Sequence, residues 1–377
     1  MFAIQSLGFS GSQSADEEFL AASNNAIKGS GAFGFITRDG LKITIENPQF
    51  TSYLENYPFL MIAGVDEITN RKTLERLSEL QNSYPNLTVK VFFNPSSSTI
   101  FHPKAYWFQN AEGGIINAGS SNMTLRGLRK NTEIGLPINV TVEDIKHIED
   151  NWNAWLYESE DFLWSLDDDK IITQAKLNEE KFKRQGRGES ASSQSDVEAE
   201  VANVNLPNES QIDYDDLEVW SFSDINIALV AEIPESGDRW KQANFSKEVF
   251  NNFFGVIPGT NASYTILLRN VSNGGILESI ESRPQVSVKS QNYRFELSAA
   301  SGIPYPINGS PIGVFIRVAV RTFIYCLVFP SDVAYQKLTE FLNNNYSGAA
   351  RTKKRVITTC SEIDDIINIL PLAILKK

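Results

Sequence analysis

The sequence predicts a two-domain protein in which a mixed α/β domain precedes a mostly β domain. Strand-like and helix-like runs alternate between residues 33 and 157, whereas short runs rich in β-branched and aromatic residues dominate after Leu217. Between these regions, residues 174–210 are rich in charged residues, serine and glycine. A chain of 377 residues is long enough for two separate hydrophobic cores.

The first domain, predicted over residues 1–173, combines a strand–helix–strand unit with three closely spaced strands. Leucines at positions 74, 77 and 80 share one face of a helix predicted over residues 70–84, which separates two apolar runs. Such a unit implies a right-handed crossover and a partly parallel sheet, so we expect a mixed sheet covered by helices. The predicted strands span residues 33–37, 59–64, 87–93, 102–108, 114–118 and 132–138, and a second helix spans residues 142–157.

Residues 174–210 are interpreted as a polar linker. The stretch begins with alternating lysine and glutamate and continues with Gln185-Gly186-Arg187-Gly188 and a serine-rich run. It offers too little apolar surface to offset the entropy of ordering it. A partly helical connector is the alternative, because residues 176–184 have fair helix propensity.

The second domain, predicted over residues 211–377, has a sequence pattern typical of a β barrel or sandwich. Its apolar runs are separated by Pro258-Gly259, Asn273-Gly274-Gly275 and Asn308-Gly309, which suit tight turns. A helix is predicted over residues 331–344. The predicted strands span residues 226–233, 264–269, 285–289, 293–297, 313–320 and 323–329.

Composition restricts the chemistry and the compartment. Two histidines, His102 and His147, and two cysteines, Cys326 and Cys360, are too few for a zinc site or a disulfide framework, so no metal or other cofactor is expected. No Walker or dinucleotide-binding motif is present. No targeting sequence or membrane-spanning run is found, and we expect a cytoplasmic protein without a membrane partner.

One short region carries the residue types that phosphodiester chemistry needs. His102 and Lys104 are two residues apart on a predicted strand, so their side chains point to the same face and can meet one phosphate group. His102 is the candidate nucleophile and Lys104 the candidate charge clamp. Ser120 and Asn122, in a glycine-containing turn, would donate to phosphate oxygens, and Glu133 would orient the imidazole.

Structural roles remain open for these residues taken singly. A lone histidine on an apolar strand is usually packed and hydrogen-bonded to backbone, and Lys104 could protect a sheet edge. His147 lies among charged residues on the polar face of a predicted helix, so we expect it to be exposed.

The spacing of the motif resembles that of the phospholipase D superfamily, which pairs His-x-Lys with a Gly-Ser or Ser-x-Asn turn and an acidic residue. Within it, the sequence is similar to the BfiI- and NgoFVII-like restriction endonucleases, in the spacing from His102 to Asn122 and to Glu133. The wider superfamily has an aspartate seven residues after the histidine, where this chain has Gln109. That departure favours the restriction-enzyme group, which also tends to lack the aspartate.

The resemblance implies a phospholipase D-like N-terminal fold and a metal-independent reaction through a phosphohistidine intermediate. Active sites of the superfamily use two copies of the motif, whereas this chain has one. The second copy would come from another chain, so the resemblance implies a homodimer formed through the N-terminal domain, with a composite active site. It also implies a bacterial protein.

More weakly, the C-terminal region resembles the B3-like pseudobarrel of the same endonucleases, in which two arms grip the major groove of double-stranded DNA. In this chain the first arm would use Ser236, Asp238, Arg239, Trp240, Lys241, Gln242 and Asn244, and the second would use Asn308, Ser310 and Arg317. The alternative is that both of these segments are ordinary hairpin turns bearing solvated charges.

The distribution of charge suggests that the two domains have different roles. Residues 1–170 carry 22 acidic and 13 basic side chains, so this domain should bind DNA poorly by itself. The sequence thus predicts a type II-like restriction endonuclease whose C-terminal domain recognises the DNA. The alternatives are a phosphatidyl hydrolase or transferase and a catalytically inactive DNA-binding protein. Whether a separate ATP-driven translocase takes part is left open.

Overall fold

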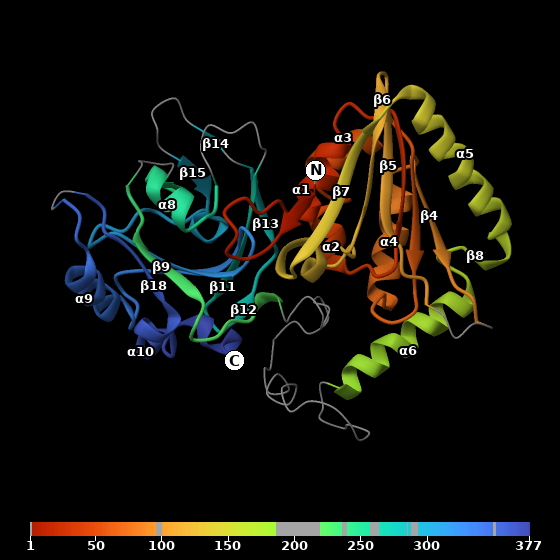
Figure 1. The fold of residues 1–377 in the computed structure, drawn as a ribbon. Helices are drawn as coiled ribbons and strands as arrows, with labels where there is room; N and C mark the ends of the chain where they lie inside the picture. Colours follow the sequence, from red (N-terminus) through yellow and green to blue (C-terminus); the bar gives the residue numbers. More distant parts are fainter. Residues whose placement is uncertain are drawn as a thin grey trace. The chain divides into compact units, whose positions relative to one another are not determined.

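A computed structural model describes residues 2–95, 100–185, 219–235, 240–256, 264–284, 286–287, 293–349 and 352–377. The described residues group into two compact units, the first containing residues 2–185 and Val219 and the second lying within residues 220–377 (Figure 1). Each unit has its own sheet system and its own buried core, and each is described by itself below.

The first unit is built on an eight-stranded mixed sheet with the strand order β1-β7-β6-β5-β2-β3-β4-β8. Strands β2, β3 and β4 are parallel to one another, while β5, β6, β7 and β1 continue the sheet in antiparallel pairs. The predicted mixed sheet is confirmed. The strands are β1 (Ala3–Gln5), β2 (Lys28–Phe33), β3 (Phe59–Gly64), β4 (Leu87–Phe92), β5 (Lys104–Asn110), β6 (Gly113–Gly119), β7 (Glu133–Val140) and β8 (Leu163–Trp164).

The helices of this unit begin at residues that cap them. The Asn70 side chain accepts from Thr73 N at the start of α4, and Thr141 and Asp144 form a capping box at the start of α5. The two helices predicted from the sequence are α4 and α5. The described helices are α1 (Ala15–Ala22), α2 (Arg38–Ile43), α3 (Pro48–Leu54), α4 (Arg71–Ser83), α5 (Val142–Glu158) and α6 (Asp169–Gln185), with a π-helix η1 (Arg126–Lys130) and a 3-10 turn η2 (Glu160–Phe162).

Helices cover both faces of the sheet. On one face, Phe19 of α1 and Phe50 of α3 pack against Phe59 and Phe108 of the strands. On the other face, α5 lies over β6, where Gly114 leaves room for the Ile145 side chain. The opposite orientation follows from the register, because Gly114 pairs with Gln109, the neighbour of Phe108 along β5.

Strand β2 differs from the prediction. A strand was expected at residues 33–37, whereas β2 spans Lys28–Phe33. Of the five residues predicted, only Phe33 belongs to the sheet. The sequence of β2 is Lys-Gly-Ser-Gly-Ala-Phe, and glycine weakens a strand pattern. Here the glycine is needed, because a Cβ atom on Gly29 would lie 2.5 Å from the ring of Phe108.

The start of the predicted linker is part of the first unit. Residues 174–185 lie in α6, in agreement with the helical alternative. Ala175 is buried, and the buried Asn178 amide donates to Val65 O at 2.8 Å and to Thr69 O at 2.9 Å. These contacts stabilise α6, although its many charged residues led to the prediction of a linker. The remainder of the predicted linker, residues 186–210, lies outside the described residues.

A buried ion pair anchors the segment between β6 and β7. Arg129 of η1 is fully buried and lies 2.6 Å from Asp16 of α1, with Glu17 at 3.6 Å. The Gln5 amide donates to the carbonyl oxygens of Gly127 and Asn131 at the two ends of the same turn. The chain between the last residue of β6 and the first of β7 is therefore tied to α1 and β1.

The second unit contains a three-stranded sheet, β10-β15-β14, and a larger sheet with the order β12-β11-β17-β16-β9-β18, to which β13 adds by pairing with β11. Helix α9 (Tyr335–Asn345) matches the predicted C-terminal helix. The strands are β9 (Ile227–Glu232), β10 (Gln242–Phe245), β11 (Thr265–Ser272), β12 (Ile276–Leu277), β13 (Glu281–Pro284), β14 (Val286–Ser287), β15 (Tyr293–Glu296), β16 (Ile312–Ala319), β17 (Thr322–Val328) and β18 (Arg355–Thr359). The other described helices are α8 (Lys247–Asn252) and α10 (Asp364–Ile367), with 3-10 turns η4 (Ser298–Ala300), η5 (Cys360–Ile363) and η6 (Pro371–Leu375).

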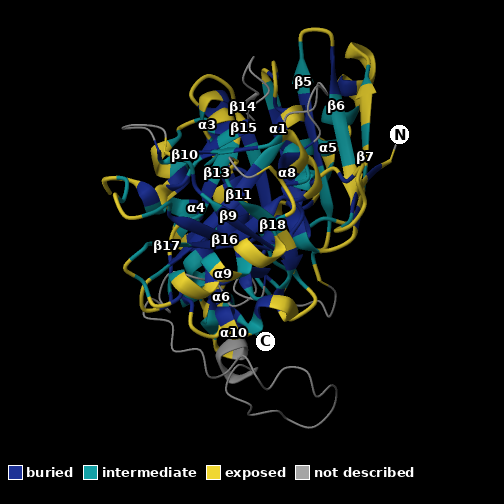
Figure 2. Cartoon of the chain, turned by 90° about the vertical axis from the view of Figure 1, so that its left-hand side faces the viewer, coloured by how far each residue is buried: buried dark blue, intermediate teal, exposed yellow. Residues whose placement is uncertain are grey.

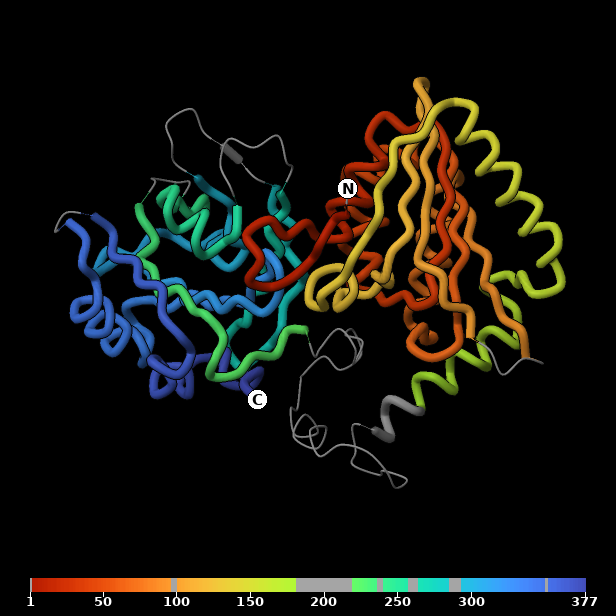
Figure 3. Tube along the Cα trace, in the orientation of Figure 1, coloured from red at the N-terminus to blue at the C-terminus, as the bar shows by residue number. Residues whose placement is uncertain are grey.

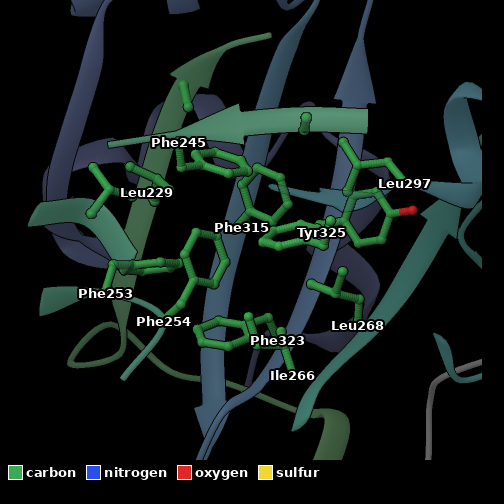
Figure 4. Close-up of a cluster of buried hydrophobic side chains, with 14 of the residues drawn as sticks. Leu229, Phe245, Phe253, Phe254, Ile266, Leu268, Leu297, Phe315, Phe323 and Tyr325 are labelled. Atoms are coloured by element: carbon green, nitrogen blue, oxygen red, sulfur yellow. The ribbon is translucent and has the colours of Figure 1, made fainter. Parts of the chain in front are cut away.

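Aromatic side chains fill the core of the second unit (Figure 4). Phe315 and Tyr325 stack at 5.4 Å between their ring centroids, and Phe254 packs edge-on against Phe315 and Phe295. Figure 2 shows the central strands β9, β11 and β16 as mostly buried. The strand pairings among the described residues do not close into a barrel, so the B3-like pseudobarrel stays a prediction.

None of the described helices is both long enough and apolar enough to cross a membrane.

The buried ion pair predicts a large stability effect. Arg129→Ala leaves Asp16 buried without its partner, and the free energy of unfolding of the first unit should fall by about 3–5 kcal/mol. Urea titration followed by hydrogen exchange of residues 126–140 measures this loss. Lys42→Ala, which removes an exposed pair with Glu46, is the control and should cost less than about 1 kcal/mol. Equal losses for the two variants would contradict the anchoring role of Arg129.

Candidate active site

The predicted catalytic residues lie at one edge of the first sheet. Because β5, β6 and β7 form an antiparallel meander, the start of β5, the end of β6 and the start of β7 meet at this edge. Their register pairs Ala105 with Ala118 and Gly119 with Gly135. The carboxyl ends of the parallel strands β2 and β3 reach the same edge, as the tube in Figure 3 traces.

His102 lies just before β5, on a backbone that packs closely against its neighbours. Gly34 N donates to Pro103 O at 2.8 Å, and a Cβ atom on Gly34 would lie 2.9 Å from the His102 Cα. The exposed imidazole contacts Phe35 edge-on, with 5.0 Å between ring centroids. The backbone of the histidine is therefore fixed while its ring nitrogens can meet a substrate.

Lys104 is a cation whose charge acts on this imidazole. Its Nζ donates to His102 O at 2.9 Å. The pKa of His102 is lowered by partial burial and by the Lys104 charge, against an opposing effect of Glu67. The pKa of Lys104 is also lowered by burial, and Glu133 opposes that shift. Both shifts favour the neutral forms, and a neutral imidazole is the nucleophilic one.

Glu133 bonds to residues other than the one predicted. Its carboxylate accepts from Ser120 Oγ and, at 3.1 Å, from Asn131 Nδ2, and the side chain is only 8% exposed. Among the described residues, no hydrogen bond joins it to the His102 ring. The predicted role of Glu133 in orienting His102 therefore has no direct contact behind it in this chain and stays a prediction. Its carboxylate instead holds the turn after β6 in place.

Asn122 is held beside His102 by the loop after β2. Its Oδ1 accepts from Phe35 N at 3.3 Å, and Met123 N donates to Phe35 O at 3.1 Å. A Cβ atom on Gly40 would lie 2.1 Å from Met123 O, so the turn packs directly on α2. The same segment, residues 34–36, thus contacts both His102 and Asn122, and it brings the two halves of the motif together.

A small cavity of about 40 Å³ opens on the α1 side of the sheet beside these residues. Lys104, Ser121 and Glu133 line it at the sheet edge, and Tyr106 and Asn117 line it deeper in. The Asn117 amide donates to the Tyr106 hydroxyl at 2.9 Å. The cavity therefore combines a cation, a carboxylate and a hydroxyl at its rim with a largely apolar lining, while His102, Ser120 and Asn122 are not among the residues that line it.

Several residues of the site were not identified from the sequence. Phe35 touches the imidazole, Asn131 supports Glu133, and Asp66 and Glu67 follow β3 at the edge that holds His102. The available signal was the position of Asp66 and Glu67 just past a buried strand, because side chains at the carboxyl ends of parallel strands gather at one edge. His147 is exposed on α5, as predicted.

Within the described residues, no group of three or more histidine, cysteine, aspartate or glutamate side chains is placed to hold a metal ion.

The residues predicted for the first DNA-binding arm are only partly described. Ser236, Asp238 and Arg239 lie outside the described residues. Trp240 was expected at the surface but is 3% exposed, and its Nε1 donates to Ile303 O at 2.7 Å. This is a correction, because a ring packed among Tyr305 and Phe329 belongs to the core. Gln242 and Asn244 lie half-buried on β10, and Lys241 lies 3.9 Å from Glu296.

The second predicted arm also divides between surface and structural roles. Asn308 is exposed, whereas the Ser310 hydroxyl bonds to Lys353 and its carbonyl accepts from Tyr335. Arg317 donates to the carbonyl oxygens of Asn252 and Phe253. The guanidinium of Arg317 therefore holds the end of α8, and its assignment to DNA contact is corrected in the same way.

Comparisons with known proteins give structural likenesses only. No protein-family model and no curated protein matches the sequence. The structure is similar to Nuc, a phospholipase D family member from Salmonella typhimurium (15% identity, 43% of this chain and 94% of that one, TM-score 0.31), and to NucT from Helicobacter pylori (15%, 44% and 98%, 0.32). It is also similar to the N-terminal domain of Helicobacter pylori LlaJI.R1 (10%, 35% and 97%, 0.26). Likenesses at this level do not define the family of the chain.

The electrostatics of the site predict how His102 titrates. Its pKa should lie below 6.5, the ordinary value for histidine. Lys104→Met removes a neighbouring positive charge and should raise this pKa, whereas Glu67→Gln should lower it further. Imidazole NMR measures both changes, because the chain has only two histidines. Lys146→Met, on the exposed surface of α5, is the control. A pKa that stays constant or falls in Lys104→Met would contradict the assigned coupling.

Proposed function

We propose that this protein is a phosphodiesterase that uses His102 as a nucleophile, in the manner of the phospholipase D superfamily. The observation that carries this proposal is the meeting of His102, Lys104, Ser120 and Asn122 at one sheet edge. His102 lies just before β5, Lys104 is its first residue, and Ser120 and Asn122 lie in the turn after β6. They supply a nucleophile, a cation and hydrogen-bond donors, which together are what displacement at phosphorus requires.

The proposed reaction has two displacements. A ring nitrogen of neutral His102 attacks phosphorus, the bond from phosphorus to the leaving oxygen breaks, and that oxygen takes a proton from an acid. Water then attacks the phosphohistidine, the P–N bond breaks and the water proton passes to the conjugate base of that acid. Lys104, with Ser120 and Asn122, would stabilise the charge on the non-bridging oxygens. No step uses a metal ion or another cofactor.

The acid must lie on the side of the phosphate opposite the nucleophile, because the attacking and leaving groups are in line. The sequence has one further histidine, His147, on the exposed face of α5. We therefore propose a homodimer formed through the N-terminal unit, in which His102 of a second copy supplies the proton.

An apolar surface next to the site supports a second copy as the partner. Ile134, Leu136 and Ile138 alternate along β7 and so share one face, and Ile4 joins them through its pairing with Ile134. They are 37–48% exposed, and β7 has exposed, yellow stretches in Figure 2. Ile134 exchanges hydrogen bonds with Ser120, so this face begins at the catalytic edge. An exposed patch continuous with half of an active site fits a two-fold interface.

For the substrate we propose double-stranded DNA, cut site-specifically as by a type II-like restriction endonuclease. Recognition would reside in the second unit, because the first carries most of the negative charge. Among the described residues, Lys241, Gln242, Asn244 and Asn308 stay proposed DNA contacts, and Ser236, Asp238 and Arg239, which lie outside the described residues, stay proposed contacts as well. Involvement of an ATP-driven translocase is a further question for experiment. The competing functions are a phosphatidyl hydrolase or transferase and an inactive DNA-binding protein.

The proposed activity predicts DNA cleavage in the presence of a chelator. Wild-type protein incubated in EDTA with plasmid and genomic DNA should yield discrete fragments, and His102→Ala should reduce cleavage by at least about 10³-fold, as expected for loss of a nucleophile. His147→Ala is the matched control and should cleave normally. Hydrolysis of phosphatidylcholine vesicles in place of DNA would support the lipid alternative. DNA binding without any cleavage would support the inactive one.

The composite site predicts how mixed dimers behave. When wild-type and His102→Ala chains are co-refolded in equal amounts, activity should fall to about a quarter of the all-wild-type value, because only wild-type homodimers are complete. Leu136→Asp should yield monomers in sedimentation experiments and should lose cleavage, whereas Val333→Asp, at an 89% exposed position of the second unit, should do neither. Half of the original activity in the mixture would indicate independent sites.

A further inference from the structure

The loop between β3 and α4, residues 65–70, lies against the histidine that the proposed function uses. It follows the carboxyl end of β3 and contains Asp66 and Glu67. The sequence motif does not include this loop. Its contacts nevertheless lead directly to the backbone of His102.

Asp66 binds the residue that precedes the nucleophile. Its Oδ2 accepts from Phe101 N at 2.7 Å, a distance typical of a hydrogen bond to a charged acceptor. Residues 100–103 belong to no strand, so the sheet ladder does not satisfy this amide. The carboxylate replaces the missing ladder partner at the point where the chain enters the catalytic edge.

The neighbours of this hydrogen bond limit the movement of the segment. The Phe101 ring stacks on Phe92, with 4.5 Å between centroids, and on Trp155 of α5. On the other side of His102, Pro103 O accepts from Gly34 N. With Asp66 in place, the backbone on both sides of the histidine is held. Without Asp66, the described part of the chain would hold the Phe101 side of the histidine by packing contacts alone.

The loop that carries Asp66 is itself held from two directions. From α6, Asn178 donates to Val65 O and Thr69 O, and Gln174 donates to Asp66 O at 3.4 Å. From the other side, Ile36 N donates to Thr69 Oγ1 at 3.1 Å. Ile36 follows Phe35, the residue that binds Asn122 and touches His102. The loop therefore connects α6 to both parts of the catalytic motif.

We propose that Asp66 is a positioning residue for His102, which it acts on through the amide of Phe101. This inference rests on the proposed function for its kinetic test. The residue needs an oxygen acceptor at this place rather than a negative charge, because the partner is a neutral N–H. Burial raises the pKa of Asp66 while the Phe101 amide opposes that shift, which agrees with a role as acceptor.

Two substitutions distinguish a requirement for an oxygen acceptor from a requirement for a negative charge. Asp66→Ala removes the acceptor and should lower kcat about 10- to 100-fold with KM changed by less than about threefold, because misplacement of a nucleophile affects the chemical step. Asp66→Asn retains an oxygen acceptor and should keep kcat within about threefold of wild type. Asp150→Ala, an exposed carboxylate on α5, is the matched control.

A second measurement does not depend on catalysis. In imidazole NMR spectra, Asp66→Ala should shift or broaden the His102 signals and leave those of His147 unchanged, while Asp66→Asn should preserve both sets. Should Asp66→Ala not fold, Asn178→Ser loosens the loop from α6 and should lower kcat about 3- to 10-fold, with a smaller change in the His102 signals.

The outcomes separate the inference from the proposed function. A wild-type protein without phosphodiesterase activity would contradict the function, and the NMR comparison would still decide the role of Asp66. His102 signals in Asp66→Ala that superimpose on those of wild type, or unchanged kcat, would overturn the positioning role. Equal losses in Asp66→Ala and Asp66→Asn would overturn it in favour of a requirement for the charge.

Discussion

The register of the β5–β6–β7 meander is the constraint on which the rest of the candidate site depends. It places residues separated by up to 31 positions, from His102 to Glu133, at one edge of one sheet. A shift of one residue would move Lys104 and Glu133 to the opposite face, away from the cavity that both now line. Close packing at Gly119, whose Cβ atom would lie 2.6 Å from Ile134 O, leaves little room for such a shift.

Buried polar groups outside the motif stabilise this edge. The ion pair of Arg129 with Asp16 holds the π-helix η1 before β7. Asn178 holds the loop that carries Asp66, and Asp66 binds the Phe101 amide next to His102. Such groups are costly to bury unless every partner is present. The same property makes them specific, because each bonds well in only one arrangement of the neighbouring segments. A rigid edge is what a nucleophile needs if it is to meet phosphorus in line.

Local patterns predicted the elements in which side-chain periodicity is strong. Helices α4 and α5 and strands β3 to β7 lie close to their predicted positions, because their apolar spacing reflects the face that each buries. Strand β2 was misplaced because its two glycines resemble a turn, although Gly29 is required by the packing of Phe108. Trp240 and Arg317 were misassigned because the local sequence does not reveal whether a ring or a guanidinium finds its partners inside.

The sequence by itself determined the alternation of strands and helices in the first unit and the identity of His102, Lys104, Ser120, Asn122 and Glu133 as a spaced set. Both are local properties of residue type and spacing. Only the tertiary structure decided what Glu133 holds, that α6 belongs to the first unit and that Asp66 binds the backbone beside His102. These contacts join segments 13 to 113 residues apart, and their hydrogen bonds form only when folding brings those segments together.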